Sequence, residues 1–385
     1  MKNLETLIQE LCPDGVEFVK LGDVLDYEQP TKYIVKCKDY QNEGMPVLTA
    51  GQTFILGYTD ETNGIFVASK ENPVIIFDDF TTSFHWVDFN FKVKSSAMKM
   101  LRVSSEREVS FRFVYYAMKC IKYQTLEHSR QWISKYSQIE IPLPPIEVQT
   151  EIVRILDKFT SLEAELEAEL DCRKRQYEYY RDKLLSFDTV GGQEVTISKI
   201  GDIGRICMCK RIMKNQTNSE SGIPFYKIGT FGKVADAYIS NDVYEEYKKM
   251  YSYPKKGDIL MSASGTIGRT VVFNGEPSYF QDSNIVWVDN DETKVFNSYL
   301  NYYYQIIEWK TQGGTIKRLY NNLLAGATIK YPSLEEQRRI VSILDRFESL
   351  TTSLQSGLPA EITARRQQYE HYRDKLLTFK RKGAA

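Results

Sequence analysis

The residues that could do chemistry are few and lie far apart along the 385-residue chain. There are three histidines, His85, His128 and His371, and six cysteines. The only close cysteine pair is Cys207 and Cys209, and no second pair follows at the spacing of a structural zinc site. We therefore expect no metal site in this chain, and we expect its cysteines to be reduced thiols.

Motifs for catalysis and cofactor binding are incomplete. The segment SGTIGRT, Ser264 to Thr270, lacks the glycine spacing and the lysine of a phosphate-binding loop. The segment NPVI, Asn72 to Ile75, only partly matches the Asn/Asp-Pro-Pro-aromatic motif of DNA-modifying enzymes, and no glycine-rich cofactor loop follows an expected strand. We predict no catalytic residues and no cofactor of its own for this chain.

Composition narrows the class of protein further. The net charge of -1 argues against a protein that coats nucleic acid through bulk positive charge. No apolar run approaches the length that a bilayer requires, and no basic, apolar leader opens the chain. The sequence therefore predicts a cytoplasmic protein. At this length, two or more domains are expected.

The strongest signal is an internal repeat. The segment RQYEYYRDKLLSF at 175–187 returns as QQYEHYRDKLLTF at 367–379. Upstream, QTEIVRILDKFTSL at 149–162 returns as QRRIVSILDRFESL at 337–350. Such a repeat indicates one structural unit that occurs twice, so this helical segment is duplicated.

Both copies are expected to form long helices, because apolar residues recur at intervals of three and four. About 40 residues at 1.5 Å each give a rod of roughly 60 Å, which needs a partner to cover its apolar seam. The residues 144–187 carry seven basic and ten acidic side chains, and residues 331–385 carry ten and seven. We therefore expect the two copies to pair as an antiparallel coiled coil. The residues predicted for helix pairing or subunit docking are Leu162, Leu166, Leu170, Tyr177, Tyr180, Leu184, Leu350, Leu354, Ile362, Tyr369, Tyr372 and Leu376.

Local signals mark where these helices begin and break. Pro145 suits a first helical turn, and Ser333 with Glu336 has the pattern of a capping box. In the second copy Pro359 disfavours helix before it, so this copy is expected to break there and restart with Pro359 in its first turn. The first copy instead contains LEAELEAEL at 162–170, a four-residue unit written twice.

The segments before the two helical copies follow one plan. Lys20 to Asp23, KLGD, opens the first and Lys199 to Asp202, KIGD, opens the second, each about 125 residues before its helix. Strands are expected at Pro73–Phe77, Phe89–Val93, Asp258–Met261, Thr270–Phe273 and Ile285–Val288, and helices at Phe111–Lys122 and Ser298–Trp309. We predict an α+β protein with globules at 1–143 and 188–330, helical segments at 144–187 and 331–379, a tail at 380–385 and a pseudo-two-fold internal repeat.

Two divergent globules separated by two nearly identical helical repeats resemble the specificity subunit of type I restriction-modification systems. Besides the repeats, the resemblance rests on LCPDGVEFVKLGDV (11–24), GDILMSASGTIGRT (257–270) and SGLPAEI (356–362), and it covers essentially the whole chain. It implies that each globule is a target-recognition domain reading one half of a split site in double-stranded DNA. It also implies that the helices dock two methyltransferase subunits, which restriction/translocase subunits join. S-adenosylmethionine, ATP and Mg would then serve the partner subunits.

Polar loop residues are the candidates for DNA contacts, because base edges are contacted by Arg, Lys, Asn, Gln, Ser and Thr. His85, beside Trp86, is equally compatible with a packing role. The Tyr-rich helix faces, which include Tyr179, are favoured as pairing or docking surface over DNA stacking. The predicted DNA-binding residues are Thr81, Thr82, Ser83, His85, Ser129, Arg130, Gln131 and Lys135 in the first globule, and Ser262, Ser264, Thr266, Arg269, Lys317, Arg318 and Asn321 in the second.

One alternative function stays open at this point. A coiled-coil scaffold that binds only proteins would explain the helices without any DNA reading. It would not explain two globules of one plan whose sequences diverge. The triplets Arg181-Asp182-Lys183 and Arg373-Asp374-Lys375 are expected to make polar contacts with partners under either reading.

Overall fold

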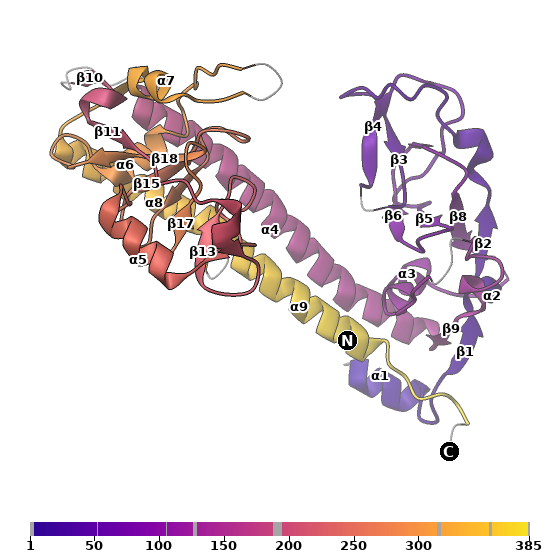
Figure 1. Cartoon of the computed structure of the whole chain (residues 1–385). Coiled ribbons are helices and arrows are strands. Elements are labelled where there is room, and N and C mark those ends of the chain that lie inside the picture. The colour runs from indigo at the N-terminus through magenta and orange to yellow at the C-terminus, as the bar shows by residue number, and fades with distance from the viewer. Residues whose placement is uncertain are drawn as a thin grey trace. The chain divides into compact units, whose positions relative to one another are not determined.

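The chain folds into two compact units in a computed structural model that describes residues 4–51, 53–104, 106–125, 129–187, 195–313, 317–353 and 356–383. Unit 1 comprises residues 1–166 and 362–385, and unit 2 comprises residues 167–361. The chain therefore passes from one unit to the other inside each repeated helical segment (Figure 1). Within the described ranges, no helix is long and apolar enough to cross a membrane.

Unit 1 is built around an antiparallel sheet with the strand order β2-β8-β5-β6. A second sheet has the order β4-β3-β7, with β3 and β7 parallel, and β1 pairs with β9 in a separate antiparallel ribbon. The strands are β1 (Glu17–Lys20), β2 (Leu25–Glu28), β3 (Met45–Leu48), β4 (Ile55–Thr59), β5 (Val74–Asp78), β6 (Phe84–Val87), β7 (Lys92–Val93), β8 (Met98–Val103) and β9 (Glu140–Leu143). The short helices are α1 (Leu4–Leu11), α2 (Leu21–Val24), η1 (Pro30–Tyr33), α3 (Phe111–Lys119) and η2 (Tyr136–Gln138).

Unit 2 repeats this plan. Its main sheet has the order β11-β18-β15-β16, its second sheet has the order β12-β14-β13-β17 with β13 and β17 parallel, and β10 pairs with β19. The strands are β10 (Thr196–Lys199), β11 (Gly204–Cys207), β12 (Thr217–Asn218), β13 (Ile223–Tyr226), β14 (Tyr238–Ile239), β15 (Ile259–Ser262), β16 (Thr270–Val272), β17 (Tyr279–Phe280), β18 (Ile285–Asn290) and β19 (Thr328–Tyr331). The short helices are η3 (Ile200–Asp202), η4 (Lys214–Gln216), α5 (Asn241–Met250), α6 (Asn297–Tyr303) and α7 (Asn321–Gly326).

The shared strand order confirms that the two globules have one plan. The predicted strands at the positions of β5, β15, β16 and β18 are present, whereas the strand expected at Phe89–Val93 shrinks to Lys92–Val93. The helix expected at Ser298–Trp309 is also too long, because α6 ends at Tyr303. The residues after Tyr303 pack on each other outside the helix. Tyr304 is buried, and its ring contacts that of Trp309 edge-on, with centroids 5.7 Å apart.

The repeated segments are helical as expected. α4 (Ile146–Ser186) runs uninterrupted for 41 residues, whereas the second copy is divided into α8 (Leu334–Thr352) and α9 (Leu358–Leu376). Pro359 lies in the first turn of α9, which confirms the predicted break and restart. Ser333 caps α8 by accepting a hydrogen bond from the backbone N–H of Glu336 at 3.4 Å. Pro145 lies one residue before α4 rather than inside it, and its carbonyl accepts the N–H groups of Val148 and Gln149.

Side-chain contacts in unit 1 show that the helical copies run antiparallel. In unit 1, Phe159 of α4 stacks on Tyr372 of α9 with ring centroids 5.5 Å apart, and Glu163 forms an ion pair with Arg366. In unit 2, Tyr180 of α4 stacks on Phe347 of α8 at 5.7 Å. As the numbering rises along α4, that of its partner falls within unit 1, as antiparallel pairing requires.

A buried glutamine fastens each helical segment to its globule. Gln149 accepts the N–H of Ser110 at 2.9 Å and donates to the carbonyl of Pro144 at 2.7 Å. Gln337 accepts the N–H of Phe296 and donates to the carbonyl of Pro332, both at 2.9 Å. Their side chains satisfy backbone groups that secondary structure leaves unpaired, which buried polar groups require.

A second matched contact joins each globule to its helix. It is a hydrogen bond from a tyrosine of the globule to the aspartate that lies eight residues after the glutamine on the helix. Tyr116 of α3 donates to Asp157, and Tyr302 of α6 donates to Asp345 at 2.5 Å. Burial, reinforced by the neighbouring carboxylates, raises the pKa of Tyr302 above its ordinary value, so the phenol keeps its proton as the donor. The repeat thus includes the contacts between globule and helix as well as the helical sequence.

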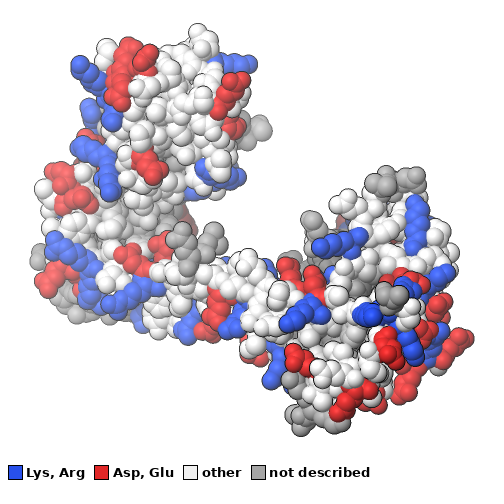
Figure 2. All heavy atoms as spheres, turned by 90° about the horizontal axis from the view of Figure 1, so that it is seen from below, with Lys and Arg blue, Asp and Glu red and all other residues white. Residues whose placement is uncertain are grey.

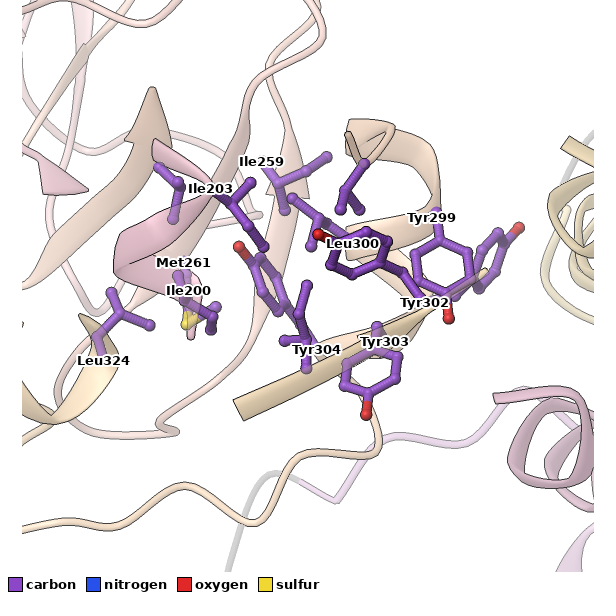
Figure 3. Close-up of a cluster of buried hydrophobic side chains, with 14 of the residues drawn as sticks. Ile200, Ile203, Ile259, Met261, Tyr299, Leu300, Tyr302, Tyr303, Tyr304 and Leu324 are labelled. Atoms are coloured by element: carbon purple, nitrogen blue, oxygen red, sulfur yellow. The ribbon is translucent and has the colours of Figure 1, made fainter. Parts of the chain in front are cut away.

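The core of unit 2 forms around α6. Tyr299, Tyr302 and Tyr303 of α6 belong to one buried cluster with Ile259 and Met261 of the main sheet (Figure 3). The hydroxyl groups of Tyr299 and Tyr303 bond the backbone of Lys330 in β19, and that of Tyr302 bonds α8. Leu185 near the end of α4 and Leu344 of α8 are both fully buried in the same cluster. Burial of such side chains stabilises a fold by about 1.5 to 3 kcal/mol each. The ends of the helical segments are therefore part of the globule's core.

The substitution Gln337→Ala should lower the free energy of unfolding of unit 2 by about 2 kcal/mol. It removes an acceptor and a donor at a fully buried position, and each buried group left unpaired costs about 1 to 3 kcal/mol. Urea unfolding of the full chain measures the change. The control is Gln312→Ala, at an exposed position in the same unit. Equal unfolding curves for the two variants would contradict this role.

Candidate nucleic-acid interface

The predicted DNA-binding residues of the first globule belong to two segments. Thr81, Thr82 and Ser83 form the turn between β5 and β6, and Ser129 to Lys135 precede η2. The carboxylate of Asp78 closes the turn by accepting the N–H groups of Phe80 at 2.9 Å and Thr81 at 2.8 Å. Thr82 adopts a φ of +59°, a left-handed backbone conformation that is typical of tight turns.

Asp79 joins these two segments. It is 1% exposed, and its Oδ1 accepts the N–H groups of Gln131 at 3.1 Å and Trp132 at 2.8 Å. Its Oδ2 lies 3.3 Å from the Nζ of Lys99, which is also 1% exposed, and 3.3 Å from the Nη1 of Arg130. The turn and the segment before η2 are therefore held together by a buried carboxylate whose charge is paired, as buried charges require.

Two of the predicted DNA-binding side chains of the first globule contact other residues of the protein. Gln131 is 1% exposed, donates to Ser129 and accepts from Tyr123, so its side chain is engaged within the protein and its DNA contact stays a prediction. The side chain supports the loop. The Nε2 of His85 lies 3.0 Å from the carbonyl oxygen of Gly51, and the ring stacks on Phe54 at 4.6 Å. Burial lowers the pKa of His85, which favours the packing role over a charged contact.

Two predicted serines of the second globule are also engaged within the protein. Ser262 is fully buried, and its hydroxyl donates to the carbonyl of Thr266 and accepts the N–H of Arg269 at 3.0 Å. Ser264 is 5% exposed, and its hydroxyl donates to Asn284 at 2.8 Å. Both serines hold the turn between β15 and β16 in shape, and neither presents a free hydroxyl group at the surface.

The remaining predicted residues of the second globule are accessible. Thr266 lies in that turn, Lys317 and Arg318 lie in the segment that leads into α7, and Asn321 is the first residue of α7. All four are exposed. Arg269 is half-buried, and its Nη2 donates to the carbonyl of Ile228 at 3.3 Å.

A matching backbone bond joins the two segments in each globule. The N–H of Gln131 donates to the carbonyl of Asp79 at 2.8 Å, and the N–H of Leu319 donates to the carbonyl of Ala263 at 2.9 Å. The accepting residue lies just past the first strand of a hairpin, β5 or β15. Each globule thus presents a hairpin turn beside a second polar segment, in the same topological place.

Sequence reasoning missed the residues that anchor these segments. Asp79, Lys99 and Asn284 were not among the candidates, although Lys99 had a usable signal: it is a charged residue inside the apolar strand MKML. A lysine at such a position is buried only when it is paired. Asp79 and Asn284 lie in ordinary turn sequences and carry no comparable signal.

The predicted helix-pairing residues differ in exposure. Ile362 is 6% exposed, and Leu166, Leu170, Tyr177, Leu184, Tyr369 and Leu376 are half-buried. Leu162 is 46% exposed, and Leu350, Tyr180 and Tyr372 are each 38% exposed. Leu354 lies outside the described residues. The apolar stripe along the paired helices therefore includes side chains that are only partly buried in this chain.

The charge distribution shows no large basic face in the available view. Lysine and arginine are interspersed with aspartate and glutamate over the surface that Figure 2 shows. Arg181 and Asp182 pair with each other at 2.8 Å, as do Arg373 and Asp374 at 2.6 Å. In the described part of the chain, no cluster of three or more His, Cys, Asp or Glu side chains is arranged to hold a metal ion.

Comparison with known proteins identifies the family. The family model described as the type I restriction modification DNA specificity domain matches the chain twice, at residues 13–171 and 192–364. The chain belongs to the type I restriction-modification DNA specificity family. A specificity subunit is the non-catalytic, target-recognition component of the restriction enzyme, which agrees with the prediction from the missing catalytic motifs.

Relatives of this specificity subunit match over nearly their whole length. A protein of Haemophilus influenzae named as a type I restriction enzyme specificity subunit is 45% identical over 395 residues, covering 98% of this chain and 100% of the relative. A type I restriction enzyme specificity subunit of Escherichia coli is 41% identical over 411 residues, covering 98% of this chain and 97% of the relative.

Solved structures share the fold. The S subunit of a type I restriction-modification system from M. genitalium matches with a TM-score of 0.53 at 15% identity, over 94% of this chain and 96% of that one. A chain from a structure concerning assembly and conformational transition of the type I restriction-modification system matches with a TM-score of 0.54 at 18% identity, over 95% and 98%. The predicted fold class is therefore confirmed.

The substitution Asp79→Ala should release the segment before η2. It leaves Lys99 buried beside Arg130 without a carboxylate, and breaking a buried ion pair costs about 3 to 5 kcal/mol. Hydrogen exchange of the full chain, read by mass spectrometry, should show at least about tenfold faster exchange in peptides covering residues 129–136, since 1.4 kcal/mol corresponds to a factor of ten. The exposed Asp60→Ala is the control. Exchange as slow as in the control would refute the anchoring role.

Proposed function

We propose that this specificity subunit reads an asymmetric, split DNA site, with one half-site for each globule. The observation that carries the proposal is that two globules of one strand order present equivalent hairpins with different side chains. The turn between β5 and β6 is anchored by Asp79, whereas the turn between β15 and β16 is anchored by Ser262 and Ser264. Two readers on one chain correspond to the two half-site readers of a dimeric DNA-binding protein, except that their targets differ.

The helical segments are proposed to dock two methyltransferase subunits, which restriction/translocase subunits then join. Tyr179 of α4 is 60% exposed and Leu162 is 46% exposed, so apolar surface is available there. Within unit 1, an apolar groove of about 470 Å³ is lined by residues of α1, α4 and α9, including Ile8, Phe159 and Leu376. Exposed apolar surface of this kind is typical of protein interfaces.

The partner subunits are proposed to supply the chemistry and its cofactors. S-adenosylmethionine would serve the methyltransferase subunits, and ATP and Mg the restriction/translocase subunits. The net charge of -1 supports a division of labour in which the methyltransferase subunits provide much of the non-specific grip on phosphates. This chain then needs only local basic side chains on its reading loops.

The methylome of a methylation-free host tests the proposed function. The chain is expressed with its neighbouring methyltransferase subunit, and the control strain expresses the methyltransferase alone. A methylated, split and asymmetric motif is expected only when both proteins are present. If both proteins are soluble and associated but no motif is methylated, the result favours a protein-binding scaffold or an inactive reader.

The repeated EAEL unit in α4 should set the spacing between the half-sites. Insertion or deletion of one four-residue unit within 162–170 changes the helix length by about 6 Å, comparable with one to two base-pair steps of about 3.4 Å. The methylome of such a variant should show a changed spacer and both half-sites unaltered. The matched control replaces one EAEL unit by EAQL at constant length. An altered half-site in the insertion variant would refute this ruler role.

A further inference from the structure

Arg130 and Arg318 occupy equivalent positions in the two globules. Each directly precedes the residue whose N–H donates to the carbonyl at the end of the first hairpin strand, Gln131 to Asp79 and Leu319 to Ala263. Asp79 and Ala263 also occupy matching positions. The N–H of Asp79 donates to the carbonyl of Ala97, just before β8, and the N–H of Ala263 donates to the carbonyl of Asn284, just before β18.

In each globule, a second backbone hydrogen bond fixes the segment that contains the arginine at its other end, just before β9 or β19. The carbonyl of Ile139 accepts the N–H of Leu21 at 2.9 Å, and the carbonyl of Ala327 accepts the N–H of Ile200 at 2.9 Å. Both carbonyls lie nine residues after the arginine. Because the segment is pinned identically at both ends, the match between Arg130 and Arg318 does not depend on any sequence alignment.

The positive charge of each arginine is largely available for an outside partner. The side chain of Arg130 is 52% exposed, and its carboxylate partner Asp79 is already paired with the buried Lys99. Arg318 is exposed, and its Nη2 donates to the side-chain oxygen of Asn284, a neutral group, at 3.3 Å. The single carboxylate of Asp79 is shared by two cations, and Asn284 carries no charge, so neither contact fully neutralises the arginine.

The same contacts orient the two side chains. Asp79 is fixed by the backbone of Gln131 and Trp132, and Asn284 is fixed by the hydroxyl of Ser264. Each arginine is therefore tethered at one nitrogen of its guanidinium group to a positioned acceptor. A side chain held in this way loses less conformational entropy when it binds.

We propose that Arg130 and Arg318 are matched base-reading residues, one for each half-site, and that each recognises guanine in the major groove. The guanidinium group is a planar fork of donors that fits the O6 and N7 acceptors of guanine, which is the commonest specific contact of arginine with DNA. This inference rests on the proposed function, because it requires each globule to read a half-site. Asp79 and Asn284 act as positioning residues for the two arginines.

Single substitutions separate the two half-sites. The variants Arg130→Ala and Arg318→Ala are expressed with the methyltransferase subunit, and the methylated motif is determined for each. Arg130→Ala should relax one G·C position in one half-site, and Arg318→Ala should relax one in the other half-site. The expected loss of discrimination at that position is roughly 5- to 150-fold, with the rest of the motif intact.

Charge-conserving and remote variants distinguish base reading from phosphate contact. Arg130→Lys and Arg318→Lys keep the charge but lose the fork, so they should relax the same positions; rescue by lysine would point to phosphate contacts. Lys70→Ala and Arg205→Ala remove an exposed charge elsewhere in each globule and should leave the motif unchanged. Association with the methyltransferase, measured by gel filtration, shows that each variant is folded.

The outcomes separate this inference from the proposed function. If the unmodified chain directs no split motif, the proposed function fails. If it does, but the arginine variants keep the motif sharp or lose methylation equally at all sites, the base-reading role is overturned. Relaxation of both half-sites by a single variant would also overturn the assignment of one arginine to one half-site.

Discussion

The junction between globule and helix depends on satisfying buried backbone groups with a side-chain amide. Gln149 accepts a hydrogen bond from the N–H of Ser110, just before α3, and donates to the carbonyl of Pro144, just before α4. Gln337 accepts from the N–H of Phe296, just before α6, and donates to the carbonyl of Pro332, just before α8. Because a buried donor or acceptor is costly to leave unpaired, the globule and the first turn of its helix are fixed to one another. A protein that reads DNA with a globule held on a helix needs this kind of fixed attachment.

The β5–β6 and β15–β16 hairpins occupy the same topological place but are anchored by different chemistry. In the first globule, the turn is joined to the neighbouring segment by Asp79, with Lys99 buried beside it. In the second globule, neutral serine and asparagine side chains perform the same task. The backbone bonds common to both are independent of side-chain identity. The surface residues of the turns can therefore differ while the scaffold that presents them stays the same.

The near-neutral net charge is consistent with a subunit that contributes selectivity to a larger assembly. Most of the visible surface mixes both charge signs, so sequence-independent attraction to phosphates is weak compared with that of a basic DNA-coating protein. Individual arginines on anchored loops can still read bases, because base readout depends on donor geometry more than on total charge. The helices retain partly exposed apolar side chains such as Leu162 and Tyr179, which are suited to protein partners.

The amino-acid sequence by itself determined the features that depend on local pattern. Apolar spacing, proline positions and the Ser333 cap predicted the helices, their break before Pro359 and the repeat, because helix formation follows contacts three and four residues apart. Only the tertiary structure decided which polar residues are accessible. Gln131, Ser262 and Ser264 are of the types that read DNA, yet long-range hydrogen bonds and packing bury them. The equivalence of Arg130 and Arg318 also comes from the structure alone, since backbone pairing between distant segments leaves no common motif in the sequence.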